Sequence, residues 1–181
     1  MDATVFIDTE FSPATTQWLS LGAVLNGEMF YAVTGDPMVI AAARAEFLEM
    51  NVEPDVEAAV PDQLHRLAAL PGVVDDQAQM ARAFAYWLQR VSPGCAVNPC
   101  YDYSADMQLL EQGMERTHMA WPAHWHPCNL AILNTEAAAE AAKQATWVMC
   151  DKKLGIRRHH ALADSAALQA AYEAQMRGAV V

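Results

Sequence analysis

Basic residues are scarce in this 181-residue chain, which has 11 Lys and Arg against 22 Asp and Glu and a formal net charge of −11 at pH 7. This balance argues against broad binding of long duplex DNA, because such binding needs many cations to neutralise phosphates. It does not exclude a local site, since acids that surround divalent ions form a positive centre once the ions are bound. Five basic residues gather within sixteen positions: Lys143, Lys152, Lys153, Arg157 and Arg158. They form either a solvated face or part of such a site.

Signals of several other protein classes are missing. No apolar run approaches the roughly 18 residues of a membrane-spanning helix, and the start of the chain lacks the basic and apolar regions of a secretory signal, so we expect a cytoplasmic protein. There is no Gly-x-Ser-x-Gly, Walker A or Rossmann glycine pattern, which are the usual signals of acyl hydrolases and nucleotide-dependent transferases. The four cysteines form no Cys-x-x-Cys pair, and we interpret them as reduced, small apolar residues: Cys95, Cys100, Cys128 and Cys150.

The N-terminal part of the chain predicts three strands. Residues 4–7 are a short run of β-branched and aromatic residues, typical of a buried strand. Two further strands are predicted over 17–25 and 28–33, joined by Asn26-Gly27, because both residues tolerate the positive φ of a type I′ turn. Gly22 inside the second strand indicates a close approach of another segment. We therefore expect an antiparallel meander at the start of a single α/β domain.

Helices dominate the remainder of the predicted domain. An insertion at about 37–72 is expected to hold helices over 39–50 and 56–70. Met80, Phe84 and Trp87 fall on one face of a helix that begins after Asp75 or Asp76 as its N-cap and runs to Val91. The other predicted elements are, in chain order, a strand over 95–101, a helix over 103–117, a helix over 137–149 capped by Thr135, and a helix over 162–176.

Carboxylates stand at the ends of predicted elements in three separate stretches. Asp8 and Glu10 follow the first strand, Asp102 follows the strand over 95–101, and Asp164 lies in the opening turns of the last helix. Acids at a buried strand end are costly unless a basic partner or a metal compensates their charge. His159, five positions before Asp164, lies on the preceding loop, so that one short segment can place an acid and an imidazole at one pocket.

Four acids in such positions suit a site for two divalent cations. Two ions about 4 Å apart stabilise the attacking and the leaving oxygens of an in-line displacement at phosphorus. Hard oxygen ligands favour Mg²⁺ or Mn²⁺, and a histidine such as His159 can take the proton from an attacking water. A solvated strand end without a metal stays open as an alternative, because residues 55–57 repeat the Asp-x-Glu spacing in an ordinary context.

Three motifs in this order resemble those of the DEDDh 3′–5′ exonucleases, in the RNase T superfamily: Asp8-x-Glu10, Tyr101-Asp102 and His159-x-Ala161-x-x-Asp164. The resemblance spans residues 4 to about 172. Residues 8–11 and Tyr101-Asp102, with Gln108-Leu109 downstream, look most like the small mycobacterial-type exoribonuclease branch. It implies an RNase H-like mixed sheet, with an antiparallel meander of three strands and then parallel strands, flanked by helices. It also implies that His159 is the general base and that four acids hold two Mg²⁺ or Mn²⁺ ions: Asp8, Glu10, Asp102 and Asp164.

The middle motif departs from the family pattern. Members often have an Asn-Ala-x-Phe-Asp run, whereas this chain has Asn-Pro-Cys-Tyr-Asp over 98–102. Asp106, four positions after Asp102, therefore competes with it for the role of third acid. His160 is expected to be a solvent-facing neighbour of His159.

The resemblance implies an activity and a substrate. We expect a metal-dependent 3′–5′ exonuclease that releases nucleoside 5′-monophosphates from single-stranded nucleic acid, with RNA favoured, and the family suggests a homodimer. A DNA-directed enzyme and a non-catalytic nucleic-acid-binding module on the same fold are the alternatives. Trp18 is open to base stacking or core packing, and substrate contacts are expected at Glu10, Phe11, Ser12, Tyr103 and His159.

Overall fold

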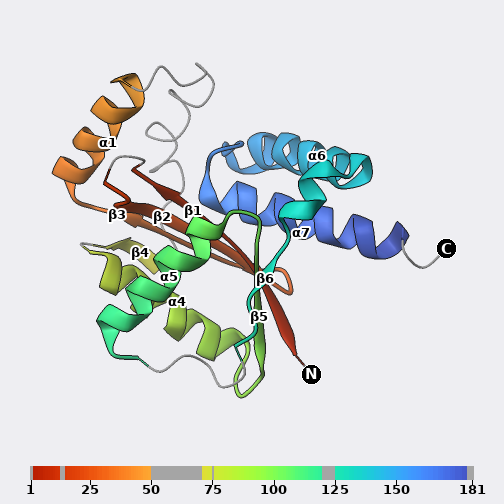
Figure 1. Ribbon diagram of the computed structural model, residues 1–181, viewed down its shortest axis with the longest axis horizontal. Coiled ribbons are helices and arrows are strands. Elements are labelled where there is room, and N and C mark those ends of the chain that lie inside the picture. The colour runs from red at the N-terminus through yellow and green to blue at the C-terminus, as the bar shows by residue number, and fades with distance from the viewer. Residues whose placement is uncertain (1, 13–14, 50–70, 75, 120–124, 179–181) are drawn as a thin grey trace.

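The computed structural model describes residues 2–12, 15–49, 71–74, 76–119 and 125–178. In this part of the chain, six strands form one sheet in the order β4-β3-β2-β1-β5-β6. Strand β1 lies inside the sheet, antiparallel to β2 on one side and parallel to β5 on the other (Figure 1). The strands are β1 Ala3–Phe11, β2 Trp18–Leu25, β3 Glu28–Thr34, β4 Pro71–Val74, β5 Val97–Tyr101 and β6 Cys128–Asn129.

The sheet has the predicted RNase H-like arrangement of an antiparallel meander followed by parallel strands. Strands β1, β2 and β3 form the meander, and β4 and β6 extend the two edges in parallel. The turn between β2 and β3 contains Asn26 and Gly27 with φ values of 52° and 83°, the two positive angles of a type I′ turn. The predicted hairpin is therefore confirmed.

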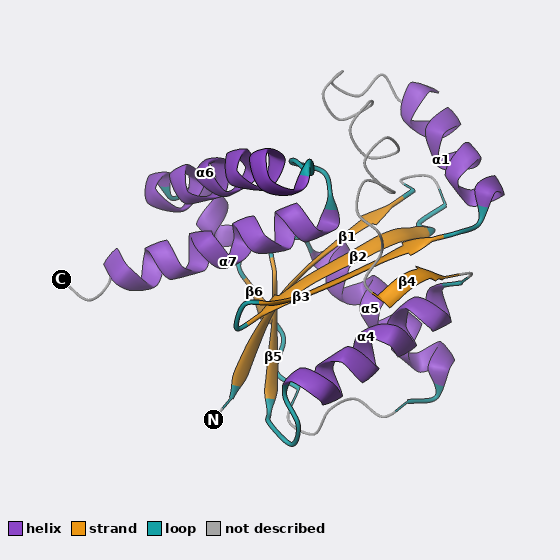
Figure 2. Ribbon diagram, turned by 180° about the vertical axis from the view of Figure 1, so that it is seen from behind, coloured by secondary structure: helices purple, strands orange, loops and turns teal. Residues whose placement is uncertain are grey.

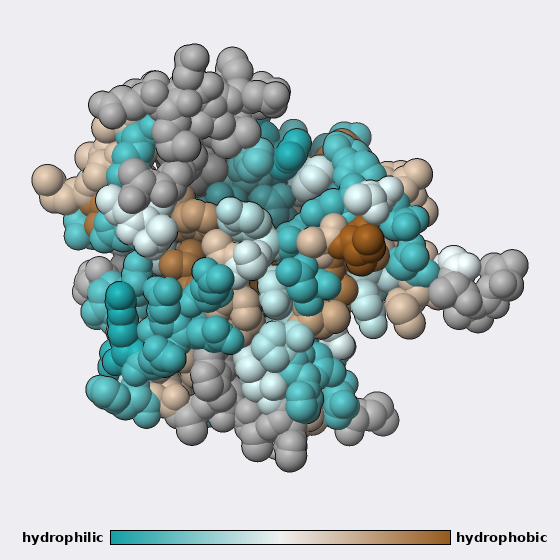
Figure 3. Space-filling model, in the orientation of Figure 1, coloured by the Kyte–Doolittle hydropathy of each residue, from teal (hydrophilic) through white to brown (hydrophobic). Residues whose placement is uncertain are grey.

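Helices cover both faces of the sheet (Figures 1 and 2). Helices α4 (Gln77–Val91) and α5 (Ser104–Thr117) pack on one face, and α6 (Ala137–Leu154) and α7 (Ala161–Gly178) lie on the other. The short 3₁₀ helix η1 (Ala131–Thr135) precedes α6, and α1 (Pro37–Glu49) follows β3. Hydrophilic side chains gather over α4, α5 and α6 in the space-filling view (Figure 3). None of the helices in the described residues is long and apolar enough to cross a membrane.

A local sequence signal explains the start of α4 but not that of α6. Asp76 caps α4 as predicted, its carboxylate accepting a hydrogen bond of 2.7 Å from the Gln79 N–H. The predicted cap of α6 is wrong by one residue: Glu136 occupies the N-cap position, while the Thr135 hydroxyl donates to the Ile132 carbonyl at the end of η1. Because the Thr135 hydroxyl is bonded within the 3₁₀ turn, it does not cap α6.

The expected helical insertion at about 37–72 is only partly described. Helix α1 accounts for its first half, whereas the second helix, expected over 56–70, lies outside the described residues. Residues 71–74 form strand β4, where no strand was predicted, because the expected helical insertion extended to about residue 72. A proline is tolerated there because β4 is an edge strand and Pro71 is its first residue.

Gly22 in β2 lies where α7 comes closest to the sheet. A Cβ atom at this position would stand 2.2 Å from the carbonyl carbon and 2.3 Å from the carbonyl oxygen of Ala161, far inside van der Waals contact. In the register of β1 and β2, Gly22 pairs with Asp8. The missing side chain therefore allows the first turn of α7 to lie against β2, beside the strand that carries Asp8.

Candidate metal centre

A cleft of about 640 Å³ opens at the C-terminal end of β1. Along β1, Val5 and Ile7 belong to the core under α4 and α5, whereas Phe6 packs with residues of α7. Because side chains alternate along a strand, Asp8 and Glu10 share the face of Phe6. The cleft is lined by all five predicted catalytic residues: Asp8, Glu10, Asp102, His159 and Asp164.

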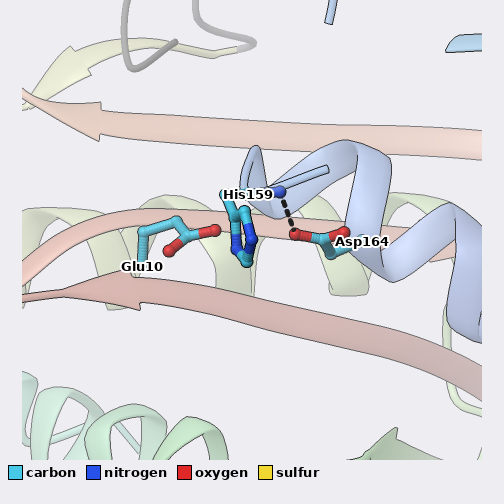
Figure 4. A group of neighbouring side chains, drawn as sticks. All are labelled: Glu10, His159 and Asp164. Carbon is cyan, nitrogen blue, oxygen red and sulfur yellow. Dashed lines mark hydrogen bonds between the residues drawn. The ribbon is translucent and has the colours of Figure 1, made fainter. Parts of the chain in front are cut away.

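The first group of ligand atoms joins β1 to the start of α7. One side-chain atom each of Glu10, His159 and Asp164 lies within 4.8 Å of the other two. Figure 4 shows the His159 ring between the two carboxylates. The Asp164 carboxylate accepts hydrogen bonds from the His159 backbone N–H at 2.8 Å and from the Trp147 indole N–H at 2.6 Å. These two bonds fix both the acid and the loop that carries the imidazole.

The second group joins β1 to the start of α5. Asp8, Asp102 and Asp106 each place one carboxylate oxygen within 4.8 Å of the other two. Asp106 is buried, and one of its oxygens accepts hydrogen bonds from the Thr9 backbone N–H at 3.1 Å and from the Thr9 hydroxyl at 2.6 Å. Asp102 instead forms an ion pair of 2.6 Å with Lys143 of α6. Both candidates for the third acid therefore lie beside Asp8, in different surroundings.

Burial and mutual repulsion shape the electrostatics of this cleft. Burial, together with neighbouring carboxylates, raises the pKa of Asp8 and of Glu10 well above the usual range. Burial also raises the pKa of Asp106 and of Asp164 to about 7, against the lowering effect of the hydrogen bonds that each accepts. Burial is the largest cause of each of these pKa shifts, and repulsion between the carboxylates adds to it.

The donor atoms of the cleft fit a hard divalent cation. One oxygen of Asp8 and one of Asp106 are buried and have no hydrogen-bond partner among the described residues. A buried carboxylate oxygen without a partner is uncommon in folded proteins, and an ion is one of its ordinary explanations. Carboxylate oxygens in this number are the ligands that Mg²⁺ and Mn²⁺ prefer.

His160 differs from the prediction of a solvent-facing neighbour, which is wrong. Its side chain is only 1% exposed, and its ring stacks on Tyr31 with the ring centroids 4.3 Å apart. Its Nδ1 atom accepts a hydrogen bond of 3.3 Å from the Leu162 N–H. The packing of α7 against β2 at Gly22 turns this residue toward the core, while His159, with a φ of 65°, lines the cleft.

The expected substrate contacts divide into two sets. Phe11 and Tyr103 line the cleft with parallel rings, 3° apart in plane and 6.2 Å apart in centroid, and Tyr103 is 59% exposed. Ser12 is buried, donates a hydrogen bond to Glu46 and is not among the residues lining the cleft. Trp18 is 1% exposed and belongs to the core, which decides between its two interpretations.

Several residues that line the cleft were not singled out individually by the motifs, and Lys143, Trp147 and Arg158 are among them. Lys143 and Trp147 come from α6, and Arg158 precedes α7, its guanidinium carbon 5.3 Å from the centroid of the Trp147 ring. Lys143 stands in the stripe of α6 that faces inward, which the alanine-rich sequence of this helix does not reveal: Ala139, Lys143, Thr146 and Cys150. Of the basic cluster, Lys152, Lys153 and Arg157 are exposed.

Comparison with models of known protein families and with curated protein sequences finds no match to this chain. The function of this protein is therefore inferred from the geometry of the cleft and from the order of the motifs in the sequence.

Proposed function

We propose that this protein is a metal-dependent 3′–5′ exonuclease that hydrolyses terminal phosphodiesters of single-stranded nucleic acid and releases nucleoside 5′-monophosphates. The proposal rests on one observation. Two clusters of carboxylates and one histidine, which come from three distant parts of the chain, line a single cleft. The resemblance of the three motifs to the DEDDh exonucleases supports the direction of cleavage and favours RNA as the substrate.

The proposed ligands of the metal ions are the carboxylates of the two groups. Asp8, Glu10 and Asp164 would hold one Mg²⁺ or Mn²⁺ ion, and Asp8 would hold the second together with Asp102 or Asp106. When bound, such ions stabilise the negative charge that develops on the phosphoryl oxygens and on the leaving oxygen. The partner-free oxygens of Asp8 and Asp106 support their direct participation, and the ion pair with Lys143 supports a less direct role for Asp102.

His159 is the proposed general base. Its imidazole lies in the cleft beside Glu10 and Asp164, where an unprotonated ring nitrogen can accept a proton from the attacking water. The hydrogen bond from the His159 backbone N–H to Asp164 holds the loop in place, so that the ring and the acid keep a fixed relation. The buried ring of His160 is committed to Tyr31 and Leu162.

Phe11 and Tyr103 are the proposed contacts of the terminal base. Aromatic side chains stack on bases without regard to sequence, because every base has a π-face. The two rings are parallel and line the same cleft as the acids, and Tyr103 is largely exposed. A terminal nucleotide could thus stack its base on this pair while its phosphate lies against the carboxylates.

The decisive experiment is a degradation assay on 5′-labelled RNA and DNA oligomers of one sequence, with Mg²⁺, with Mn²⁺ and with EDTA. We expect a ladder that shortens from the 3′ end in the presence of metal, faster on RNA than on DNA, and no shortening in EDTA. Faster loss of DNA would identify a DNA-directed enzyme that uses the same five residues. Intact oligomers of both kinds, with a folded protein, would refute the exonuclease and favour a binding module.

A further inference from the structure

Lys143 is a buried lysine on the face of α6 that packs toward the sheet. Its side chain is 8% exposed, and among the described residues it is the one lysine or arginine that is buried. It follows Ala139 and precedes Thr146 and Cys150 on the inward face of α6, where the spacing of four, three and four positions selects one side of the helix. An ammonium group in such a position is costly unless it is paired, so its surroundings are informative.

Two acceptors hold the Lys143 ammonium in place. Its Nζ atom lies 2.6 Å from an oxygen of Asp102 and 2.5 Å from the side-chain oxygen of Asn134. A lysine ammonium carries three N–H donors, and no acceptor for the third is present among the described residues. Lys143 also lines the cleft with the carboxylates and the Phe11–Tyr103 pair. The cleft therefore contains a fixed positive charge with one donor to spare.

The two acceptors differ in charge and therefore stabilise the ammonium in different ways. Asp102 supplies the opposite charge that makes burial of the ammonium tolerable, whereas the neutral Asn134 adds direction without adding charge. Neutralising Asp102 alone would not need a buried lysine, since the Asp102 side chain is 20% exposed and reaches water. An ammonium that is held from two sides at the wall of a cleft is arranged to donate its third N–H to an anion that enters.

We propose that Lys143 binds the phosphate of the terminal nucleotide, with Asp102 and Asn134 as its positioning residues. This inference rests on the proposed function for the identity of the ligand, a nucleotide phosphate. The ammonium donates a charge-assisted hydrogen bond to a non-bridging phosphoryl oxygen and opposes the repulsion of that phosphate by the carboxylates of the cleft. Asp102 thereby acts through Lys143, which leaves Asp106 as the third acid beside Asp8.

The test compares the binding of AMP with that of adenosine, which differ by the phosphate, in calorimetric titrations with Mg²⁺ present. The wild type should bind AMP more tightly than adenosine. Lys143→Met should weaken AMP by about tenfold or more and leave adenosine within about twofold. Lys152→Met, at an exposed position of the same helix, is the matched control and should change neither ligand.

A double variant separates phosphate binding from simple neutralisation. Asp102→Asn with Lys143→Met removes both charges, so the fold does not have to carry an unpaired carboxylate, and thermal melting checks that it is intact. The AMP deficit should persist in this variant. Recovery of the wild-type preference for AMP would overturn the proposal, as would a wild type that binds both ligands equally or a Lys143→Met variant that keeps the preference. A wild type without nuclease activity would instead refute the exonuclease, because these titrations need no turnover.

Discussion

The first and the second group of candidate ligand residues in the cleft have different neighbours. Glu10, His159 and Asp164 form the first group, in which two neutral N–H donors hold Asp164, and the charge of Arg158 opposes the rise in the Asp164 pKa. Asp8, Asp102 and Asp106 include a carboxylate that is paired with the buried Lys143. One group therefore combines acids with an imidazole, which suits proton transfer, and the other combines acids with a fixed cation, which suits binding of an anion.

This difference indicates a division of labour across β1. Asp8 and Glu10 lie on the same strand two residues apart, yet Asp8 groups with Asp102 and Asp106 near the start of α5, and Glu10 groups with His159 and Asp164 near the start of α7. A strand that ends in Asp-x-Glu can thus serve two chemically distinct neighbourhoods.

Replacement of Asp8, the acid on β1 that belongs to the second group, should have the largest effect on activity. Asp8→Asn should lower the turnover number by about three orders of magnitude, because it removes a ligand whose charge the bound ions require. The same change should raise the melting temperature of the metal-free protein, since burial and neighbouring acids disfavour the ionised form of Asp8. Single-turnover assays and thermal melting in EDTA measure the two effects.

Asp151→Asn, at an exposed position of α6, is the control for that substitution. It removes the same formal charge outside the cleft and should leave both turnover and melting unchanged. An Asp8→Asn variant that keeps wild-type turnover would contradict the proposed site.

The two adjacent histidines should respond in opposite ways. His159→Ala should lower turnover by about two to three orders of magnitude with little loss of stability, as expected for a general base. His160→Ala should lower the free energy of unfolding by about 2 to 3 kcal/mol and leave the turnover of the folded fraction nearly intact, because it deletes a buried ring packed on Tyr31. Turnover and chemical denaturation of each variant are the measurements. The reverse pattern would show that His160 is the base.

A methyl group at Gly22 should disturb the first group more than the second. Gly22→Ala would force the backbone of Ala161 away from β2, and we expect a loss of about 2 to 4 kcal/mol in the free energy of unfolding and a lower turnover number. Gly178→Ala is the matched control, because a Cβ atom there meets nothing within 4 Å. Denaturation curves that coincide for the two variants would mean that the close approach is absent in solution.

The stability of the metal-free protein should fall as the pH rises. Asp106 and Asp164 have an ordinary pKa of 3.8 and a folded-state pKa of about 7, so the folded chain binds more protons than the unfolded chain between these values. The free energy of unfolding should therefore decrease between about pH 4 and pH 7, by about 2 kcal/mol or more. Melting curves in EDTA at pH 5 and pH 8 measure this loss, and Mg²⁺ should raise the melting temperature more at pH 8. Higher stability at pH 8 in EDTA would contradict the shifts.

The sequence was most informative where the interactions are local. The Asn26-Gly27 turn specifies the first hairpin, and the apolar stripe with Asp76 at its start specifies α4, because turn geometry and helix periodicity depend on near neighbours in the chain. Strand β4 was missed because its four residues carry no pattern of their own and pair in parallel with β3, a contact that spans some forty positions. Such pairing is decided by distant residues.

The candidate site divides in the same way. The resemblance of the motifs to the DEDDh family implied one site for Asp8, Glu10, His159 and Asp164, and all four line the same cleft. The choice between Asp102 and Asp106 was not settled by the sequence, because it depends on Lys143, which reaches the cleft from α6. The orientation of His160 was also out of reach, since it follows from the packing of α7 against Gly22.

The sequence by itself therefore determined the meander and the face of α4 that packs on the sheet, because short patterns of polarity and turn residues encode both. The tertiary structure decided which acid keeps a partner-free oxygen, which histidine lines the cleft and which lysine enters it. The physical reason is that burial and charge pairing are properties of the assembled chain. The surroundings of each carboxylate in the cleft are complete only when α5, α6 and α7 pack around the end of β1.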